Sequence, residues 1–154
     1  MEDSNTDKSA EENVKKLDTF ANDQGYLISI RKDNNIFNGN VGQALVSVLY
    51  PGIIKGLYLN ETQTECTTCI KGNIKYVSIK EKEDGTKEVK TFIIGERNPI
   101  LVKTSPKIWH GYTPLANKEA VILHLIDKEY NPQEKATQRR DPFYFGDVWT
   151  VKDN

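Results

Sequence analysis

The stretch CIKGNIKYVSIKEKEDGTKEVKTFII, residues 69–94, decides the fold class of this chain. After Gly72, apolar and polar residues alternate, which is the period-two pattern of a strand with one buried face. Asp84 and Gly85 then separate this run from a second β-rich run at residues 87–94. An Asp-Gly dipeptide between two such runs is the strongest short-range indication of a hairpin. The segment therefore predicts two long antiparallel strands.

Further short β-rich runs lie on both sides of this hairpin. They are separated by turn residues such as the Asp-Asn-Asn at 33–35 and the Pro-Gly at 51–52. Many short strands joined by such turns predict an all-β sandwich or barrel, and closure into a barrel would remove exposed sheet edges. The first arm of the hairpin is expected within the run 66–82, and the other predicted strands are residues 25–32, 42–52, 53–60, 100–104, 120–127 and 147–151.

Length and charge narrow the class of protein. The chain has 154 residues, enough for one ordinary domain, and a formal net charge of -1. This balance favours neither a nucleic-acid nor a membrane partner, and an apolar run such as 120–126 is too short to span a bilayer. The polar, acidic start lacks the pattern of a secretory signal, which predicts a cytoplasmic protein.

Residues 1–20 are expected to form a polar arm, and residues 21–154 are expected to form the β-barrel domain. The arm is either disordered or a short helix capped by Ser9 and Glu12 that runs through Leu17.

Cys66 and Cys69 form a CxxC pair, for which we considered zinc and redox roles. A structural zinc site needs about four ligands, and no second CxxC exists. A thioredoxin-like motif opens a helix, whereas this pair lies in a β-branched stretch. We therefore expect both cysteines to be structural.

Three stretches carry a family resemblance. GIIKGLYLN, residues 52–60, resembles the G-V-hydrophobic-R/K-G-L-H segment of the dTDP-4-dehydrorhamnose 3,5-epimerases. Residues 98–117 resemble the segment in which a short loop of that family ends in A-H-G-F before a strand. Residues 120–142 resemble its Y-N-P segment followed by a D-P turn. Together the matches cover about residues 26–142. The resemblance implies a cupin-type jelly-roll barrel and a strand-exchanged homodimer.

The resemblance also implies a pocket whose acid–base residues are rearranged. Such an epimerase needs a base, an acid on the opposite side and a group that stabilises an enolate. Tyr58 stands where the family has its basic histidine, and His124 stands where it has the opposing tyrosine. Glu65 aligns with a family lysine and Gln24 with a family arginine, whereas His110 matches the second pocket histidine. The implied catalytic residues are His110, His124 and Tyr58.

The resemblance also implies that five side chains bind substrate. Lys55 stands where a basic residue meets the nucleotide diphosphate, and Gln43 matches a glutamine near the nucleotide. Tyr130 matches the tyrosine of Y-N-P. Asn60 and Glu65 complete this set.

Taken without the resemblance, these residues have ordinary structural interpretations. His124 shares its predicted strand face with Ile122 and Ile126, which suits a hydrogen-bonded core histidine. Tyr58 suits ordinary barrel packing. His110 lies in a predicted loop, where binding residues concentrate.

No metal or other cofactor is predicted. A cupin metal site needs clustered histidines and a carboxylate, and the chain has only two histidines. The positions of a His-x-His pair hold Tyr58 and Asn60, so only Glu65, His110 and His124 could gather around an ion.

Two hypotheses from different classes follow. The first is a nucleotide-sugar epimerase or isomerase that transfers protons next to the ketone of a 4-keto-6-deoxyhexose, in polysaccharide or deoxysugar biosynthesis. A 3,4-ketoisomerase is a variant of this hypothesis, because it uses the same enolate. The alternative is a non-catalytic cupin that binds a nucleotide sugar or another carbohydrate.

Overall fold

The computed structural model describes residues 13–30, 41–129, 131–133 and 137–153. These residues form twelve strands and no helix, so the described part of the chain has no helix able to span a membrane. The cytoplasmic location stays a prediction. The strands are β1 (Val14–Lys16), β2 (Asp18–Asn22), β3 (Gly25–Ser29), β4 (Gln43–Leu49), β5 (Lys55–Asn60), β6 (Glu65–Lys71), β7 (Asn73–Glu81), β8 (Lys87–Gly95), β9 (Ile100–Thr104), β10 (Trp109–Pro114), β11 (Ala120–Ile126) and β12 (Thr137–Arg139).

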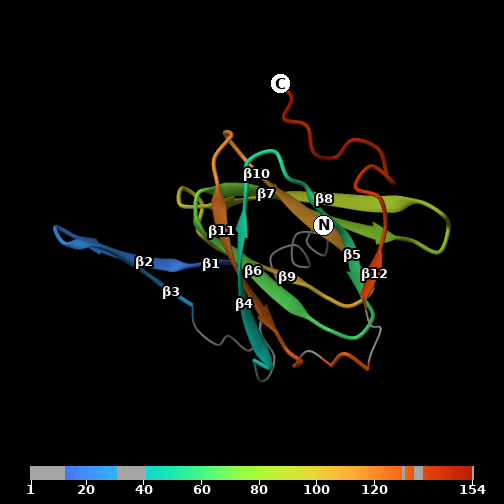
Figure 1. Ribbon diagram of the computed structural model, residues 1–154, viewed down its shortest axis with the longest axis horizontal. Coiled ribbons are helices and arrows are strands. Elements are labelled where there is room, and N and C mark those ends of the chain that lie inside the picture. Colours follow the sequence, from blue (N-terminus) through green and yellow to red (C-terminus); the bar gives the residue numbers. More distant parts are fainter. Residues whose placement is uncertain (1–12, 31–40, 130, 134–136, 154) are drawn as a thin grey trace, which may run out of the picture.

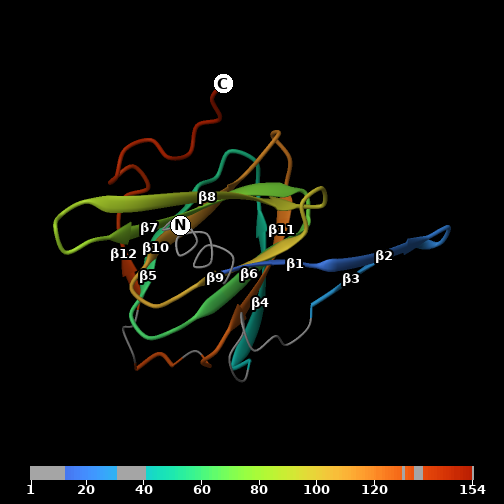
Figure 2. The same ribbon diagram turned by 180° about the vertical axis from the view of Figure 1, so that it is seen from behind.

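Two five-stranded antiparallel sheets make up the body of the molecule (Figure 1). The first has the strand order β1-β9-β6-β11-β4, and the second has the order β12-β5-β10-β7-β8. The β2–β3 hairpin stands away from both sheets, as the view from behind also shows (Figure 2). The predicted all-β class is confirmed, although no strand pairing among the described residues joins the two sheets into one closed barrel.

The β7–β8 hairpin is the longest pairing in the second sheet. Its register runs from Asn73 opposite Gly95 to Glu81 opposite Lys87. At the turn, Gly85 has a φ of 85°, a conformation that residues with a Cβ rarely adopt. The hairpin predicted from the Asp-Gly dipeptide is thus confirmed.

The main core lies between the two sheets. It is built from inward-facing residues of β7, β8 and β10 in the second sheet and of β4, β6, β9 and β11 in the first. Its members include Leu49, Cys69, Ile74, Tyr76, Ile94, Val102, Tyr112 and Ile122.

A second cluster covers the outer face of the second sheet. The C-terminal segment brings Trp149 over this face, where it packs with Leu57, Leu59, Val77, Ile79 and Trp109. The guanidinium of Arg140 lies 4.3 Å from the Trp109 ring centroid and 4.2 Å from that of Tyr144, and it binds the Glu81 carboxylate at 2.8 Å. Cation–π contacts and an ion pair therefore hold the C-terminal segment to the sheet.

Several expectations about elements were wrong or incomplete. Residues 147–151 form no strand, because Asp147 instead accepts hydrogen bonds from the backbone of Trp149 and Thr150 in a turn. Residues 109–114, expected as a loop around His110, form β10, which pairs with β5 on one side and β7 on the other. Strands β1, β2 and β12 were not predicted, and the run 66–82 is divided at Gly72, where φ is 76°, into β6 and β7 of different sheets.

The predicted arm includes β1, which pairs with β9 of the first sheet, so Val14–Lys16 is a strand rather than part of a short helix. Extended pairing beside Leu101 and Val102 satisfies its backbone, and this outweighs the weak local preference for helix. Residues 1–12, with the predicted cap at Ser9 and Glu12, lie outside the described residues.

The two cysteines lie on β6 and point to opposite sides of the first sheet. Cys66 packs with Leu17 and Leu101 on one side, and Cys69 belongs to the core between the sheets. Burial raises the pKa of Cys66 to about 12 and that of Cys69 to about 11. Both thiols stay protonated near neutral pH, which suits packing rather than redox chemistry.

Candidate active site

A cavity of about 370 Å³ opens between the two sheets. Its walls come from both sheets, chiefly β4, β6 and β11 of the first and β5, β10 and β12 of the second. The lining residues are Leu45, Val46, Ser47, Lys55, Tyr58, Asn60, Gln63, Glu65, His110, Tyr112, His124, Ile126 and Thr137.

Strand alternation directs the chemically active side chains into this cavity. On β11, His124 points inward with Ile122 and Ile126, whereas the residues between them are partly exposed. On β5, Tyr58 lies opposite His110 of β10 in the strand register, so both side chains stand on one face of the second sheet. Tyr58 and His124 therefore reach the cavity from facing sheets.

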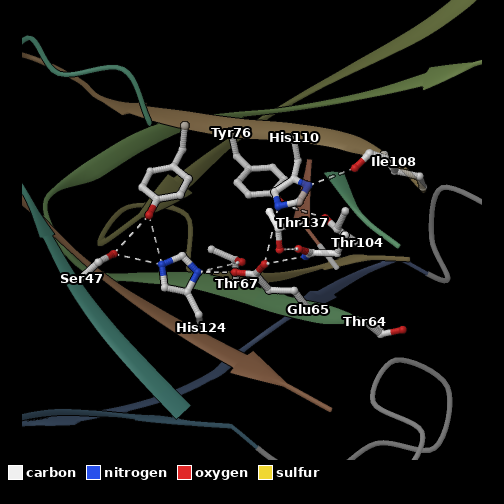
Figure 3. Close-up of polar contacts among 12 residues, drawn as sticks. Ser47, Thr64, Glu65, Thr67, Tyr76, Thr104, Ile108, His110, His124 and Thr137 are labelled. Carbon is white, nitrogen blue, oxygen red and sulfur yellow. Dashed lines mark hydrogen bonds and ion pairs between the residues drawn. The ribbon is translucent and has the colours of Figure 1, made fainter. Parts of the chain in front are cut away.

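Glu65 connects the two histidines at the floor of the cavity (Figure 3). Its Oε1 lies 2.5 Å from Nδ1 of His124, and its Oε2 lies 3.6 Å from Nε2 of His110. Asn60 also donates from Nδ2 to Glu65 Oε2 at 3.5 Å. One nearly buried carboxylate thus serves both imidazoles.

The electrostatics of this trio favour an ionised Glu65. Burial raises the pKa of its carboxyl, but hydrogen bonds from His110 and His124, together with their charges, bring the pKa well below its usual range. An ionised carboxylate can only accept hydrogen bonds, so Nδ1 of His124 carries a proton. In the neutral ring, Nε2 of His124 then holds the free lone pair.

That lone pair lies on the cavity side of the ring. Nε2 of His124 is 3.0 Å from the Ser47 hydroxyl and 3.2 Å from the Tyr112 hydroxyl, and all three residues line the cavity. An imidazole oriented by a carboxylate through one nitrogen, with the other directed to the ligand space, is the arrangement of a general base.

His110 is held differently. Its Nδ1 donates to the backbone carbonyl of Ile108 at 3.0 Å, and its Nε2 faces Glu65. Both ring nitrogens therefore face oxygen atoms of the protein, and neither is directed to the ligand space. His110 is thus suited to pair with Glu65 rather than to remove a proton.

The structure gathers most of the residues that the resemblance singled out. Tyr58, His110, His124, Lys55, Asn60 and Glu65 all line the cavity. Gln43 lies at the start of β4, opposite Ile126, and is not among the lining residues. Tyr130 lies outside the described residues.

Among the cavity residues that the sequence did not predict, Ser47 and Tyr112 contact Nε2 of His124. Tyr112 follows His110 by two positions, so it shares the inner face of β10 once that segment is a strand. Because this segment was expected to be a loop, the shared face of His110 and Tyr112 was not predicted. Ser47 lies within a predicted strand, but nothing local marked its inward direction.

The trio does not form a metal centre in this arrangement. Among the described residues, no group of three or more His, Cys, Asp or Glu side chains is placed to hold a metal ion. Glu65 and His124 instead satisfy each other through a direct hydrogen bond.

Comparison with known proteins identifies relatives of this chain. No protein-family model matches the chain. It is 30% identical over 128 residues to the spore coat polysaccharide biosynthesis protein SpsL of Bacillus subtilis (strain 168), covering 82% of this chain and 85% of that protein. It is 24% identical over 130 residues to the probable low-salt glycan biosynthesis epimerase Agl13 of Haloferax volcanii, with coverages of 82% and 83%.

Solved structures share the fold at lower identity. The dTDP-4-dehydrorhamnose 3,5-epimerase from Bacillus anthracis str. Ames superposes with a TM-score of 0.76 at 17% identity, covering 91% of this chain and 85% of that one. The predicted cupin-type jelly-roll fold is confirmed by this likeness.

Proposed function

Because this chain belongs to the cupin-fold dTDP-4-dehydrorhamnose 3,5-epimerase-like family, we propose that it is a nucleotide-sugar isomerase. Its substrate would be a 4-keto-6-deoxyhexose carried on a nucleoside diphosphate, and its reaction would invert a carbon next to the ketone. The relatives named for spore coat polysaccharide and for glycan biosynthesis support a place in polysaccharide or deoxysugar biosynthesis.

The observation that carries this proposal is the placement of His124 and Tyr58 on facing sheets. Inversion at a carbon requires that a proton leave from one side and return from the other. Nε2 of His124 removes the proton, while Glu65 fixes the ring through Nδ1. The electron pair moves onto the ketone oxygen as an enolate.

Tyr58 returns a proton to the opposite side of the carbon. After this step His124 holds one additional proton and Tyr58 is a phenolate, and exchange with solvent restores both groups. The roles are reversed relative to those that the family resemblance assigns to these two strands.

Side chains at the edge of the cavity suit a nucleotide diphosphate. Lys55 lines the cavity from the first residue of β5, and its side chain is exposed. A flexible, solvated ammonium can bind phosphate oxygens as a point charge. We assign Lys55 and Asn60 to substrate binding, and retain Gln43 and Tyr130 as predicted contacts with the nucleotide.

The projecting hairpin supports a homodimer as part of this proposal (Figures 1 and 2). Phe20, Tyr26 and Leu27 on β2–β3 are more than half exposed, as are Val46 and Val48 on the edge strand β4. Apolar surface of this kind on a hairpin and a sheet edge suits a second copy of the chain. Phe20→Glu with Leu27→Glu should yield a monomer in analytical ultracentrifugation, whereas an unchanged mass would contradict this role.

Proton exchange at the sugar tests the enzymatic proposal. The protein is incubated in D₂O with 4-keto-6-deoxyglucose on several nucleoside diphosphates, and deuterium at C3 and C5 is followed by NMR and mass spectrometry. We expect incorporation by the wild type and its loss in His124→Ala. Tight binding without incorporation on any carrier would instead favour the non-catalytic alternative.

A further inference from the structure

The hydroxyl of Tyr112 occupies an unusual place in the cavity. It lies 3.2 Å from Nε2 of His124 and 3.2 Å from the Ser47 hydroxyl. The side chain is otherwise nearly buried, and its ring belongs to the core between the sheets. A rigid aromatic ring thus presents one polar atom beside the nitrogen to which we assign proton removal.

The proposed reaction needs a donor at this position. Removal of a proton next to a ketone places negative charge on the ketone oxygen, and a preorganised hydrogen-bond donor lowers the energy of that charge. Glu65 lies beside His124, but an anionic carboxylate that accepts from two histidines cannot supply the donor. Another residue must therefore stabilise the enolate.

Tyr112 meets the chemical requirements. Burial raises the pKa of its hydroxyl to about 12, so the group stays protonated and able to donate near neutral pH. The ketone oxygen is two bonds from the carbon that loses its proton. The 3.2 Å between the Tyr112 oxygen and Nε2 of His124 therefore suits simultaneous contact with the oxygen and that carbon.

We propose that the Tyr112 hydroxyl binds the ketone oxygen of the substrate and stabilises the enolate by donating a hydrogen bond. This assignment rests on the proposed isomerase function. When substrate enters, the hydroxyl turns from His124 to the ketone and keeps its own proton. The carbon–hydrogen bond breaks toward Nε2 of His124, and its electron pair ends on the oxygen that Tyr112 holds.

The chain contains a matched control in Tyr76. Its ring is stacked with that of Tyr112 at a centroid distance of 6.4 Å and an interplanar angle of 6°. Its hydroxyl, however, is bonded to Thr104 at 2.6 Å and is fully buried outside the cavity lining. Tyr112→Phe and Tyr76→Phe each remove one oxygen atom from one of two parallel rings. Tyr112→Phe keeps the ring that packs in the core, so the first variant should fold.

Two measurements on the full-length protein separate this inference from the proposed function. The first is the ¹³C resonance of a bound 4-keto-6-deoxyglucose nucleotide labelled at C4, which moves downfield when the ketone accepts a hydrogen bond and requires no turnover. The second is the rate of deuterium incorporation from D₂O. We expect a downfield shift in the wild type and in Tyr76→Phe, and its loss in Tyr112→Phe. Incorporation should fall about 100-fold in Tyr112→Phe and stay within about threefold in Tyr76→Phe.

The outcomes are distinguishable. A downfield shift that persists in Tyr112→Phe, or is missing in the wild type, overturns the role of Tyr112. Incorporation that is absent from the wild type overturns the isomerase proposal, while the carbonyl shift still decides whether Tyr112 binds the ketone.

Discussion

The two faces of the second sheet differ sharply although the same strands supply both. On β10, Trp109 joins the apolar cluster beneath the C-terminal segment, whereas its neighbours His110 and Tyr112 line the cavity. On β5, Leu57 and Leu59 lie on the covered face and Tyr58 lies between them on the cavity face. At these positions of β5 and β10 the covered face is held by apolar packing, whereas the cavity face carries hydrogen bonds and charges beside the core between the sheets.

Alternate residues of the same strands therefore serve stability and the proposed chemistry. The covered face should tolerate changes in its polar partners with a loss of stability alone. The cavity face should show large losses of activity whatever the accompanying change in stability, because its polar side chains are placed for the proposed reaction.

The largest expected effect follows Glu65→Gln. The substitution removes the charge that holds His110 and His124, and the amide can present an N–H rather than an acceptor to Nδ1 of His124. We expect about a 1,000-fold loss of deuterium incorporation. Incorporation rates with saturating keto sugar would measure it.

Glu81→Gln provides the matched control on the covered face. Glu81 accepts from the Trp109 indole at 3.0 Å and pairs with Arg140, so its replacement should lower the melting temperature and leave the incorporation rate nearly unchanged. If Glu65→Gln and Glu81→Gln lowered activity equally, the proposed difference between the two faces would be wrong.

Trp149→Ala should give the next largest effect, this time on stability. The ring is nearly buried against the covered face, and its indole donates to the carbonyl of Pro142 at 2.8 Å. Truncating a buried tryptophan costs about 3 kcal/mol of the free energy of unfolding. Urea denaturation would measure this loss, and the incorporation rate per folded molecule should match the wild type. Unchanged stability together with lost activity would show that Trp149 acts in the reaction rather than in packing.

A smaller effect is expected on the acid side of the stability profile. The pKa of Glu65 is depressed in the folded protein, so its contribution to stability is complete above its unfolded value of about 4.5 and is lost as the pH falls below that value. The groups that face it are His110 and His124. Between pH 5 and pH 3 this one carboxyl should account for about 2 kcal/mol of the loss in unfolding free energy.

Urea denaturation at several pH values would test this, with Glu65→Gln as the comparison. The decline should be less steep in Glu65→Gln than in the wild type. Parallel declines would show that Glu65 is not preferentially ionised in the folded state.

Much of the fold was predictable because local patterns agree with the final pairing. The alternation after Gly72 and the Asp-Gly turn identified β7 and β8, and the run 120–127 identified β11 with His124 on its inner face. By contrast, β10 was missed. Its segment contains Gly111 and Pro114, and pairing with β5 and β7 overrides their weak strand preference.

The candidate site was only partly predictable for a related reason. The resemblance identified Tyr58, His110, His124 and Glu65, but their mutual contacts depend on how the two sheets face each other. The direct bond between Glu65 and His124 joins residues 59 positions apart in sequence. Gly111 shows the same limit, since a Cβ there would meet the Lys55 carbonyl oxygen at 2.5 Å, a close approach that no local pattern reveals.

In the proposed reaction, His124 and Tyr58 act from opposite sides of one carbon. The most direct test is the ratio of deuterium incorporation to inversion in Tyr58→Phe, measured by NMR on a 4-keto-6-deoxyhexose nucleotide in D₂O. We predict that incorporation continues while inversion falls at least about 100-fold, because His124 still forms the enolate but the opposite side lacks its acid. Inversion that keeps pace with incorporation in this variant would show that Tyr58 is not the acid on the opposite side.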